Sequence, residues 1–140
     1  FTGLNEMVNS LTGGVYEKLS MEFMLGQCFR IVAFVIGISW ADSLQVGSLL
    51  GQKLVLNEFI AYVSLAEMKE SLSVSERSII ISTYALCGFA NFGSIAIQIG
   101  GIGSLVPEQQ ANLSKLGFKA LIAATLATLV TANTAGVLLN

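Results

Sequence analysis

The stretch SLQVGSLLGQKLVLNEFIAYVSLA, residues 43–66, contains two apolar pieces separated by the Gly-Gln-Lys at 51–53. Each piece is too short to cross a bilayer, because a transmembrane helix needs about 20 apolar residues. Asp42 can cap the first piece as a helix. Two half-length helices joined by a polar turn predict a re-entrant hairpin over 42–66. Broken or re-entrant helices mark binding sites in transporters, because their ends offer free backbone groups.

The residues before this hairpin predict two membrane-associated segments. In residues 1–20, apolar side chains recur at helical spacing with polar ones between them, which is typical of a short interfacial helix. Residues 21–41 are apolar over about the length of one span and predict a transmembrane helix. Arg30 lies inside this span. It either snorkels to the interface or faces protein, because a charge that faces lipid is costly.

The residues after the hairpin predict two further spans. Residues 78–107 carry no charge and are long enough to cross the membrane, but glycines and Asn91 interrupt them. They predict a broken transmembrane helix. A polar connection follows at 108–119, and the Ala-, Thr- and Leu-rich residues 116–140 predict a last transmembrane helix.

The composition is typical of a protein that uses the bilayer as solvent. Hydrophobic residues make up 54% of the 140 residues and charged ones 11%, against about 25% charged in soluble domains. The predicted fold class is therefore an all-α integral membrane protein. A net charge of −2 gives no support for nucleic-acid binding. The lack of histidine excludes a His triad or His metal site within the chain, and neither an enzyme nor a cofactor is expected.

Ionisable and amide side chains at membrane depth are the candidate site residues. Glu58 lies in an apolar piece of the hairpin next to Asn57, and an intramembrane carboxylate indicates a functional site. The alternatives are that Glu58 pairs with a buried Lys or Arg, or reaches water at the hairpin tip. Asn91 and Ser94 lie one helical turn apart and share a face, beside Phe89. Asn91 either binds a ligand or hydrogen-bonds a neighbouring helix. A single aromatic side chain in a span, such as Phe89, more often packs against other helices than stacks on a ligand. Together these residues predict a polar ligand site at mid-membrane depth.

Two long strings resemble the signature segments of the concentrative nucleoside transporter family. They are GQKLVLNEFIAY at 51–62 and YALCGFANFGSIAIQIGG at 84–101, and the likeness covers nearly the whole chain. The resemblance implies a multi-pass symporter of the plasma (inner) membrane that imports nucleosides such as uridine, driven by sodium or protons. It implies an eight-helix transporter fold with two opposed hairpins, assembled as a homotrimer, that works by elevator-like alternating access. On that reading residues 21–41 are a scaffold helix.

The resemblance also implies roles for individual residues. Glu58 matches the hairpin carboxylate that binds ribose hydroxyls, Asn91 the ribose-binding Asn of the broken helix, and Ser94 the Ser beyond it. Phe89 matches the aromatic beside the base, and Asn57 precedes the carboxylate as in the family. The coupling-ion site is expected outside this chain. The sequence starts with Phe1 and is therefore expected to be a portion of a longer transporter.

One position departs from the family pattern. Gly93 stands where many members have Ser, although Ser94 remains. A competing hypothesis is a non-transporting structural subunit of a membrane complex. It predicts that Glu58 and Asn91 satisfy each other or a partner helix, with no small-molecule pocket. A membrane enzyme is a weak third hypothesis, since the chain has no nucleophile–base pair.

Overall fold

The computed structural model describes residues 21–139, so the interfacial helix expected over 1–20 lies outside the described residues. The described part is all-α and contains no strand, as the fold class predicts. Its helices are α2 (Met21–Val35), α3 (Ser43–Val55), α4 (Glu58–Glu70), α5 (Glu76–Leu86), α6 (Phe92–Leu105), the short 3-10 helix η1 (Pro107–Gln109) and α7 (Gln110–Leu138).

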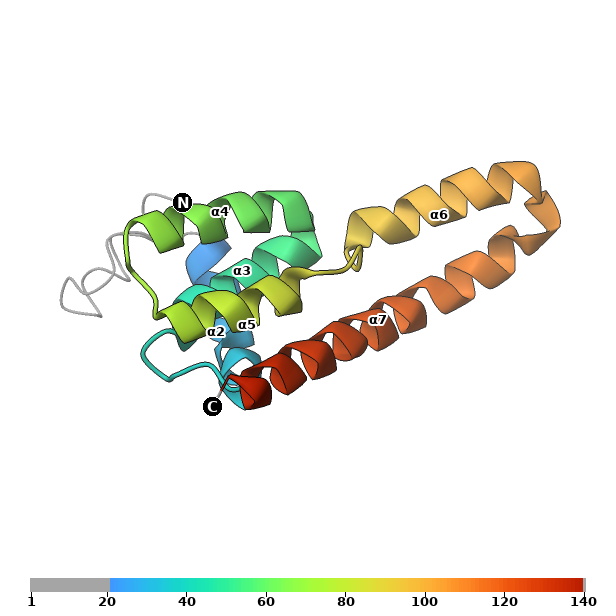
Figure 1. Cartoon of the computed structure of the whole chain (residues 1–140). Coiled ribbons are helices and arrows are strands. Elements are labelled where there is room, and N and C mark those ends of the chain that lie inside the picture. Colours follow the sequence, from blue (N-terminus) through green and yellow to red (C-terminus); the bar gives the residue numbers. More distant parts are fainter. Residues whose placement is uncertain (1–20, 140) are drawn as a thin grey trace.

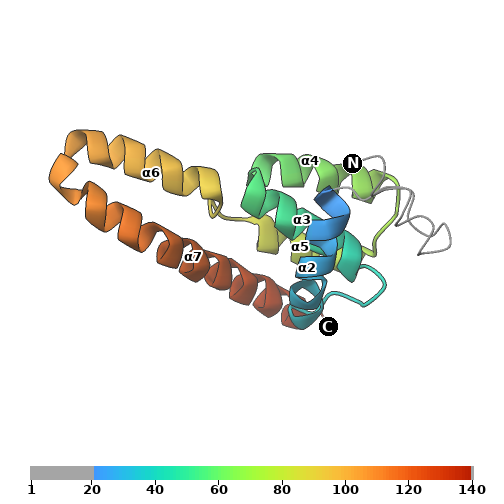
Figure 2. The same ribbon diagram turned by 180° about the vertical axis from the view of Figure 1, so that it is seen from behind.

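The helices form a bundle with one long arm. Helices α2 to α5 gather at one end of the molecule, and α6 extends from them and returns as α7 (Figure 1). The C-terminal half of α7 packs along α5, and seen from behind α2 lies against α3 (Figure 2). Helices α3 and α4 therefore form a hairpin inside the bundle, and the arm starts beside the tip of that hairpin.

The hydrophobic core lies where the hairpin meets α2, α5 and α7. Its fully or nearly fully buried side chains come from all five helices and from the loop after α2, and they are Ala33, Ile36, Ile38, Val46, Leu49, Leu50, Ala61, Leu65, Ile81, Ala85, Leu86 and Ala132. Van der Waals packing of these side chains holds the hairpin against α5, since packing is what associates helices in a bilayer.

One helical segment among the described residues is long and apolar enough to cross a membrane. It is Pro107–Leu138, which joins η1 to α7 and reaches a mean hydropathy of 1.7 over a window of 18 residues. Two shorter apolar helices are Phe23–Val35 and Phe92–Leu105. The prediction that 108–119 is a separate polar connection is wrong, since these residues lie in η1 and α7. Their polar side chains are compatible with a helix. Pro107 stands at the start of η1, where a proline is tolerated.

The prediction that residues 51–53 separate the two half-helices is also wrong. These residues lie inside α3, and the hairpin turns at Leu56 and Asn57. Gly51 serves close packing instead of a turn, because a Cβ there would lie 2.3 Å from the Cβ of Leu25 on α2. The glycine that suggested a helix break in the sequence therefore allows close contact between α3 and α2.

Glycines also bring the backbones of α2 and α3 together. A Cβ on Gly47 would lie 2.6 Å from the carbonyl oxygen of Gly26 and 2.9 Å from the backbone nitrogen of Arg30. A Cβ on Gly26 would lie 2.9 Å from the carbonyl oxygen of Leu44. Backbone atoms cannot move aside as a flexible side chain can. These glycines therefore set the separation of the two helices.

Arg30 faces protein, which decides between the two alternatives for this charge. Its Nε donates a hydrogen bond to the Ser43 hydroxyl at 3.2 Å, and its guanidinium lies 3.9 Å from the centroid of the Trp40 ring. Helix α2 ends at Val35, and Gly37 follows with φ +98°, a conformation that favours glycine. The residues after α2 thus turn back so that Trp40 covers Arg30.

Asp42 ties the start of the hairpin to the start of α5. Its Oδ2 accepts hydrogen bonds from the hydroxyls of Ser75 and Ser78, each at 2.7 Å, and from the Ser75 backbone N–H at 3.2 Å. The Ser75 hydroxyl also caps α5, since it accepts from the Ser78 N–H. One buried carboxylate therefore positions α5 relative to α3.

We expect Gly47→Ala to destabilise the protein by about 1–3 kcal/mol, because the new methyl group would meet backbone on three sides. The control is Gly100→Ala on α6, where a Cβ would meet nothing within 4 Å. That change should be neutral or slightly stabilising, since Ala favours helix over Gly by about 0.5–1 kcal/mol. Thermal unfolding of the two variants in detergent checks this, and equal melting temperatures would contradict it.

Candidate functional site

The tip of the hairpin presents Glu58 at the first turn of α4. Asn57 precedes it in extended backbone, with φ −168° and ψ 169°, and its Oδ1 accepts a hydrogen bond from the Ile60 N–H at 3.0 Å. This N-cap starts α4 at Glu58, whose side chain is half-buried. A carboxylate in the first turn also interacts favourably with the helix dipole. Asn57 therefore shapes the tip through its cap.

The second part of the site is the break between α5 and α6. Helix α5 ends at Leu86, Gly88 has φ +146°, and Asn91 caps α6 in extended backbone. The Asn91 Oδ1 accepts from the Ser94 N–H at 2.8 Å, and the Asn91 side chain is nearly completely buried. The glycine allows the chain to turn, and the Asn begins the next helix.

A hydrogen bond joins the hairpin tip to this break. The Asn91 Nδ2 donates to the Glu58 Oε2 at 3.0 Å, across 33 residues of sequence. The Ser94 hydroxyl lies 2.9 Å from the Asn91 Oδ1 and 2.8 Å from the carbonyl oxygen of Phe89, and shares its one proton between them. Glu58, Asn91 and Ser94, which the sequence predicts as site residues, thus form one polar network.

This network keeps capacity for further hydrogen bonds. An ionised carboxylate offers about four acceptor positions, and an amide nitrogen has two protons. The contact between Glu58 and Asn91 uses one of each. A neighbouring hydroxyl group can therefore be bound by the same pair without breaking it. The arrangement suits a ligand with adjacent hydroxyls.

Phe89 takes part through its backbone, while its side chain is 61% exposed within the described structure. It borders a cavity of about 100 Å³ between α6 and α7, together with Asn91, Ser94 and Gln98. Gln98 was missed by the sequence reasoning. Its spacing of four residues from Ser94 on an apolar helix is the signal that could have found it.

A cavity of this size is smaller than the roughly 300 Å³ or more of typical ligand pockets. The described residues alone therefore do not enclose a cavity of ligand size next to Asn91 and Ser94. Across residues 21–139, no group of three or more His, Cys, Asp or Glu side chains is placed to hold a metal ion.

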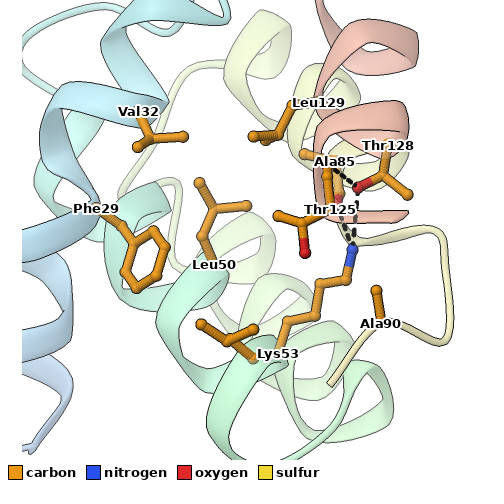
Figure 3. A pocket seen from close by; sticks show the side chains of 10 residues that line it. Phe29, Val32, Leu50, Lys53, Ala85, Ala90, Thr125, Thr128 and Leu129 are labelled. Atoms are coloured by element: carbon orange, nitrogen blue, oxygen red, sulfur yellow. Dashed lines mark hydrogen bonds between the residues drawn. The ribbon is translucent and has the colours of Figure 1, made fainter. Parts of the chain in front are cut away.

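Lys53 is the buried lysine near the site, and it does not form the hydrogen-bonded pair with Glu58 that the structural alternative allowed. Its Nζ donates to the carbonyl oxygen of Ala85 at 3.0 Å and to the Thr128 hydroxyl at 3.3 Å (Figure 3). The hydrogen-bond partner of Glu58 is Asn91 instead. The carboxylate thus takes its hydrogen bond from a neutral donor, while Lys53 interacts with it only through charge.

Comparison with known proteins identifies the architecture in which these residues occur. The model of the Na+ dependent nucleoside transporter C-terminus matches residues 1–136. An uncharacterized transporter, YutK of Bacillus subtilis, is 43% identical over 141 residues, covering 97% of this chain and 34% of the relative. Sodium/nucleoside cotransporter 1 of Mus musculus is 41% identical over 135 residues, covering 87% of this chain and 21% of the relative.

A solved structure gives the same result. The structure of CNTnw in an inward-facing substrate-bound state superposes with a TM-score of 0.81 at 39% identity, covering 97% of this chain and 33% of that chain. The chain therefore spans about a third or less of the proteins that it matches.

We expect Asn91→Asp to destabilise the protein by about 1–3 kcal/mol at neutral pH. Asp keeps the N-cap, but it replaces the donor to Glu58 by a second carboxylate. The penalty should shrink as the pH falls, because a proton shared between the two carboxyl groups restores a donor. The control Asn57→Asp also keeps its cap and faces no acid in a hydrogen bond, so its stability should hardly change. Thermal unfolding across pH compares the two, and equal pH profiles would refute the donor role of Asn91.

Proposed function

Since this chain belongs to the concentrative nucleoside transporter family, as its C-terminal region, we propose that it supplies the ribose-binding half of the nucleoside site in an ion-coupled importer. Members of the family are multi-pass transporters of the plasma membrane rather than enzymes. The observation that carries the proposal is the hydrogen bond from Asn91 to Glu58, which joins the hairpin to the broken helix at 3.0 Å.

The two side chains have the chemistry that a ribose requires. Adjacent hydroxyl groups are each a donor and an acceptor. A carboxylate accepts from both, while the free amide proton of Asn91 donates to one of them. Ser94 holds the Asn91 side chain in place through two hydrogen bonds to its Oδ1. Phe89 borders the cavity beside them and would contact the base. Asn57 would act by fixing the start of α4.

Transport requires that this half-site be exposed to each side of the membrane in turn. We propose that the hairpin and the broken helix move together as one body, in an elevator-like alternating-access cycle. Their shared hydrophobic core supports such a unit. The family's description names sodium, and either sodium or protons would be coupled through residues outside those described. A homotrimer is proposed from the family likeness.

A structural subunit remains the second candidate because one observation favours it. That hypothesis predicts that Glu58 and Asn91 bond to each other, and one hydrogen bond joins them here. It also predicts that no small-molecule pocket adjoins them, whereas a cavity of about 100 Å³ borders Asn91 and Ser94. Protection of the hairpin by nucleoside in hydrogen exchange separates the two, since only a transporter would show it.

We expect gradient-driven uridine uptake by proteoliposomes that contain the full-length transporter, and its loss in Glu58→Gln. The amide removes the charge that accepts the ribose hydroxyls, at a cost of about 1.5–3 kcal/mol. The control is Glu67→Gln, an exposed acid on the same helix, which should keep uptake. Imposed sodium and proton gradients, tested separately, identify the coupling ion.

Uptake that survives Glu58→Gln would keep the transporter but reject Glu58 as the ribose ligand. No uptake of nucleoside under either gradient would favour the structural subunit.

We also expect 2′-deoxyuridine to compete less well than uridine. The missing hydroxyl removes one hydrogen bond between the ribose and this pair, which costs about 1–3 kcal/mol, or roughly 5- to 150-fold in affinity. Inhibition of labelled uridine uptake by each compound measures the ratio. Equal inhibition constants would show that Glu58 and Asn91 do not bind both ribose hydroxyls.

A further inference from the structure

Helix α5 ends beside the site with backbone carbonyls that its own helix does not satisfy. The last four carbonyls of any α-helix have no partner within it. In α5 the Tyr84 carbonyl accepts from the Cys87 N–H at 3.2 Å. Two others are satisfied by the hairpin. The Lys53 Nζ of α3 donates to the Ala85 carbonyl at 3.0 Å, and the Tyr62 hydroxyl of α4 donates to the Thr83 carbonyl at 2.8 Å.

The hairpin thus holds both ends of the helix break. Lys53 and Tyr62 bind the last turn of α5, while Glu58 binds Asn91 at the first turn of α6. The charges match the helix dipoles: the ammonium lies at the negative end of α5, and the carboxylate lies at the positive end of α6. The span from Cys87 to Asn91 is therefore fixed on both sides by one structural element.

Lys53 is also the centre of a tightly packed cluster. It is only 3% exposed, and its second hydrogen bond goes to Thr128 on α7. A Cβ on Gly88 would lie 2.7 Å from the Cγ2 of Thr128 and 3.9 Å from the Lys53 Nζ. The glycine that opens the break therefore packs against Thr128 and against the Lys53 ammonium itself. Figure 3 shows the ammonium between Ala85 and Thr128, with apolar side chains around the rest of the cavity.

Stability alone does not explain a lysine at this position. A buried ammonium loses its hydration, and its hydrogen bonds only offset that cost. A methionine of similar length would fill the same space without the cost. The adjoining cavity measures about 20 Å³, about one water molecule, so it is not itself a nucleoside site. What the lysine adds is a directional hold on the end of α5.

We propose that Lys53 is a positioning residue of the nucleoside site: its hydrogen bond to the Ala85 carbonyl sets the break between α5 and α6, and so places Asn91 for the ribose beside Glu58. This inference rests on the proposed function. Tyr62 performs the same task from the other arm of the hairpin, because it binds the Thr83 carbonyl, two residues before Ala85. Neither side chain needs to touch the substrate.

The test measures KM and Vmax for uridine and 2′-deoxyuridine in proteoliposomes that contain the full-length transporter. Lys53→Met should raise the KM for uridine about tenfold, the loss expected for one misplaced hydrogen bond. It should raise the KM for 2′-deoxyuridine less. The ratio of the KM for 2′-deoxyuridine to the KM for uridine should therefore fall. The control Lys69→Met removes an exposed lysine from the same hairpin and should leave both KM values unchanged.

The outcomes separate this inference from the proposed function. If the wild-type protein neither binds nor takes up uridine, the proposed function fails and the positioning role fails with it. If the wild type transports and Lys53→Met keeps the ratio of KM values, the positioning role alone is refuted, even when Vmax falls. If Lys53→Met does not fold, as judged by size exclusion and melting, Tyr62→Phe decides. An unchanged ratio in that milder variant overturns the proposal, and a lower ratio supports it.

Discussion

The side-chain amide of Asn91 is the interaction on which the site depends. Its oxygen accepts from the Ser94 N–H and thereby begins α6, while its nitrogen donates to Glu58 on the hairpin. One planar group therefore fixes both the direction of a helix and its contact with a segment 33 residues away. Aspartate would keep the first function and lose the second, and a hydrophobic residue would lose both. Asparagine meets both needs because its amide combines an acceptor with donors.

Three charged side chains among the described residues bond to groups on neighbouring helices or turns. Arg30 binds Ser43 and Trp40, Asp42 binds the start of α5, and Lys53 binds its end. Each charged side chain thus fastens one helix to another at a terminus or a turn. This is where a backbone in lipid has unmet hydrogen bonds, and where a charge is least costly. The contacts that offset the cost of burying these charges also determine how the helices are arranged around the site.

The sequence predicted the helical class, the membrane setting and the residues of the polar network. It did so because a carboxylate and an amide in apolar segments are costly and conspicuous. It failed where one residue type serves two purposes. Gly51 reads as a helix breaker, yet its missing side chain leaves room for Leu25. The polar residues of 108–119 read as a loop, yet they continue α7. Only packing between distant segments separates these cases, and no local pattern records it.

The close approach of α2 and α3 bears on where a moving body could be divided from a stationary one. Two surfaces slide past each other only when side chains between them can change rotamer. Backbone lies against backbone at Gly26 and Gly47, and a shift by part of a 5.4 Å helical turn would drive larger residues into that gap. A sliding movement of α3 along α2 would therefore require the two backbones to separate first.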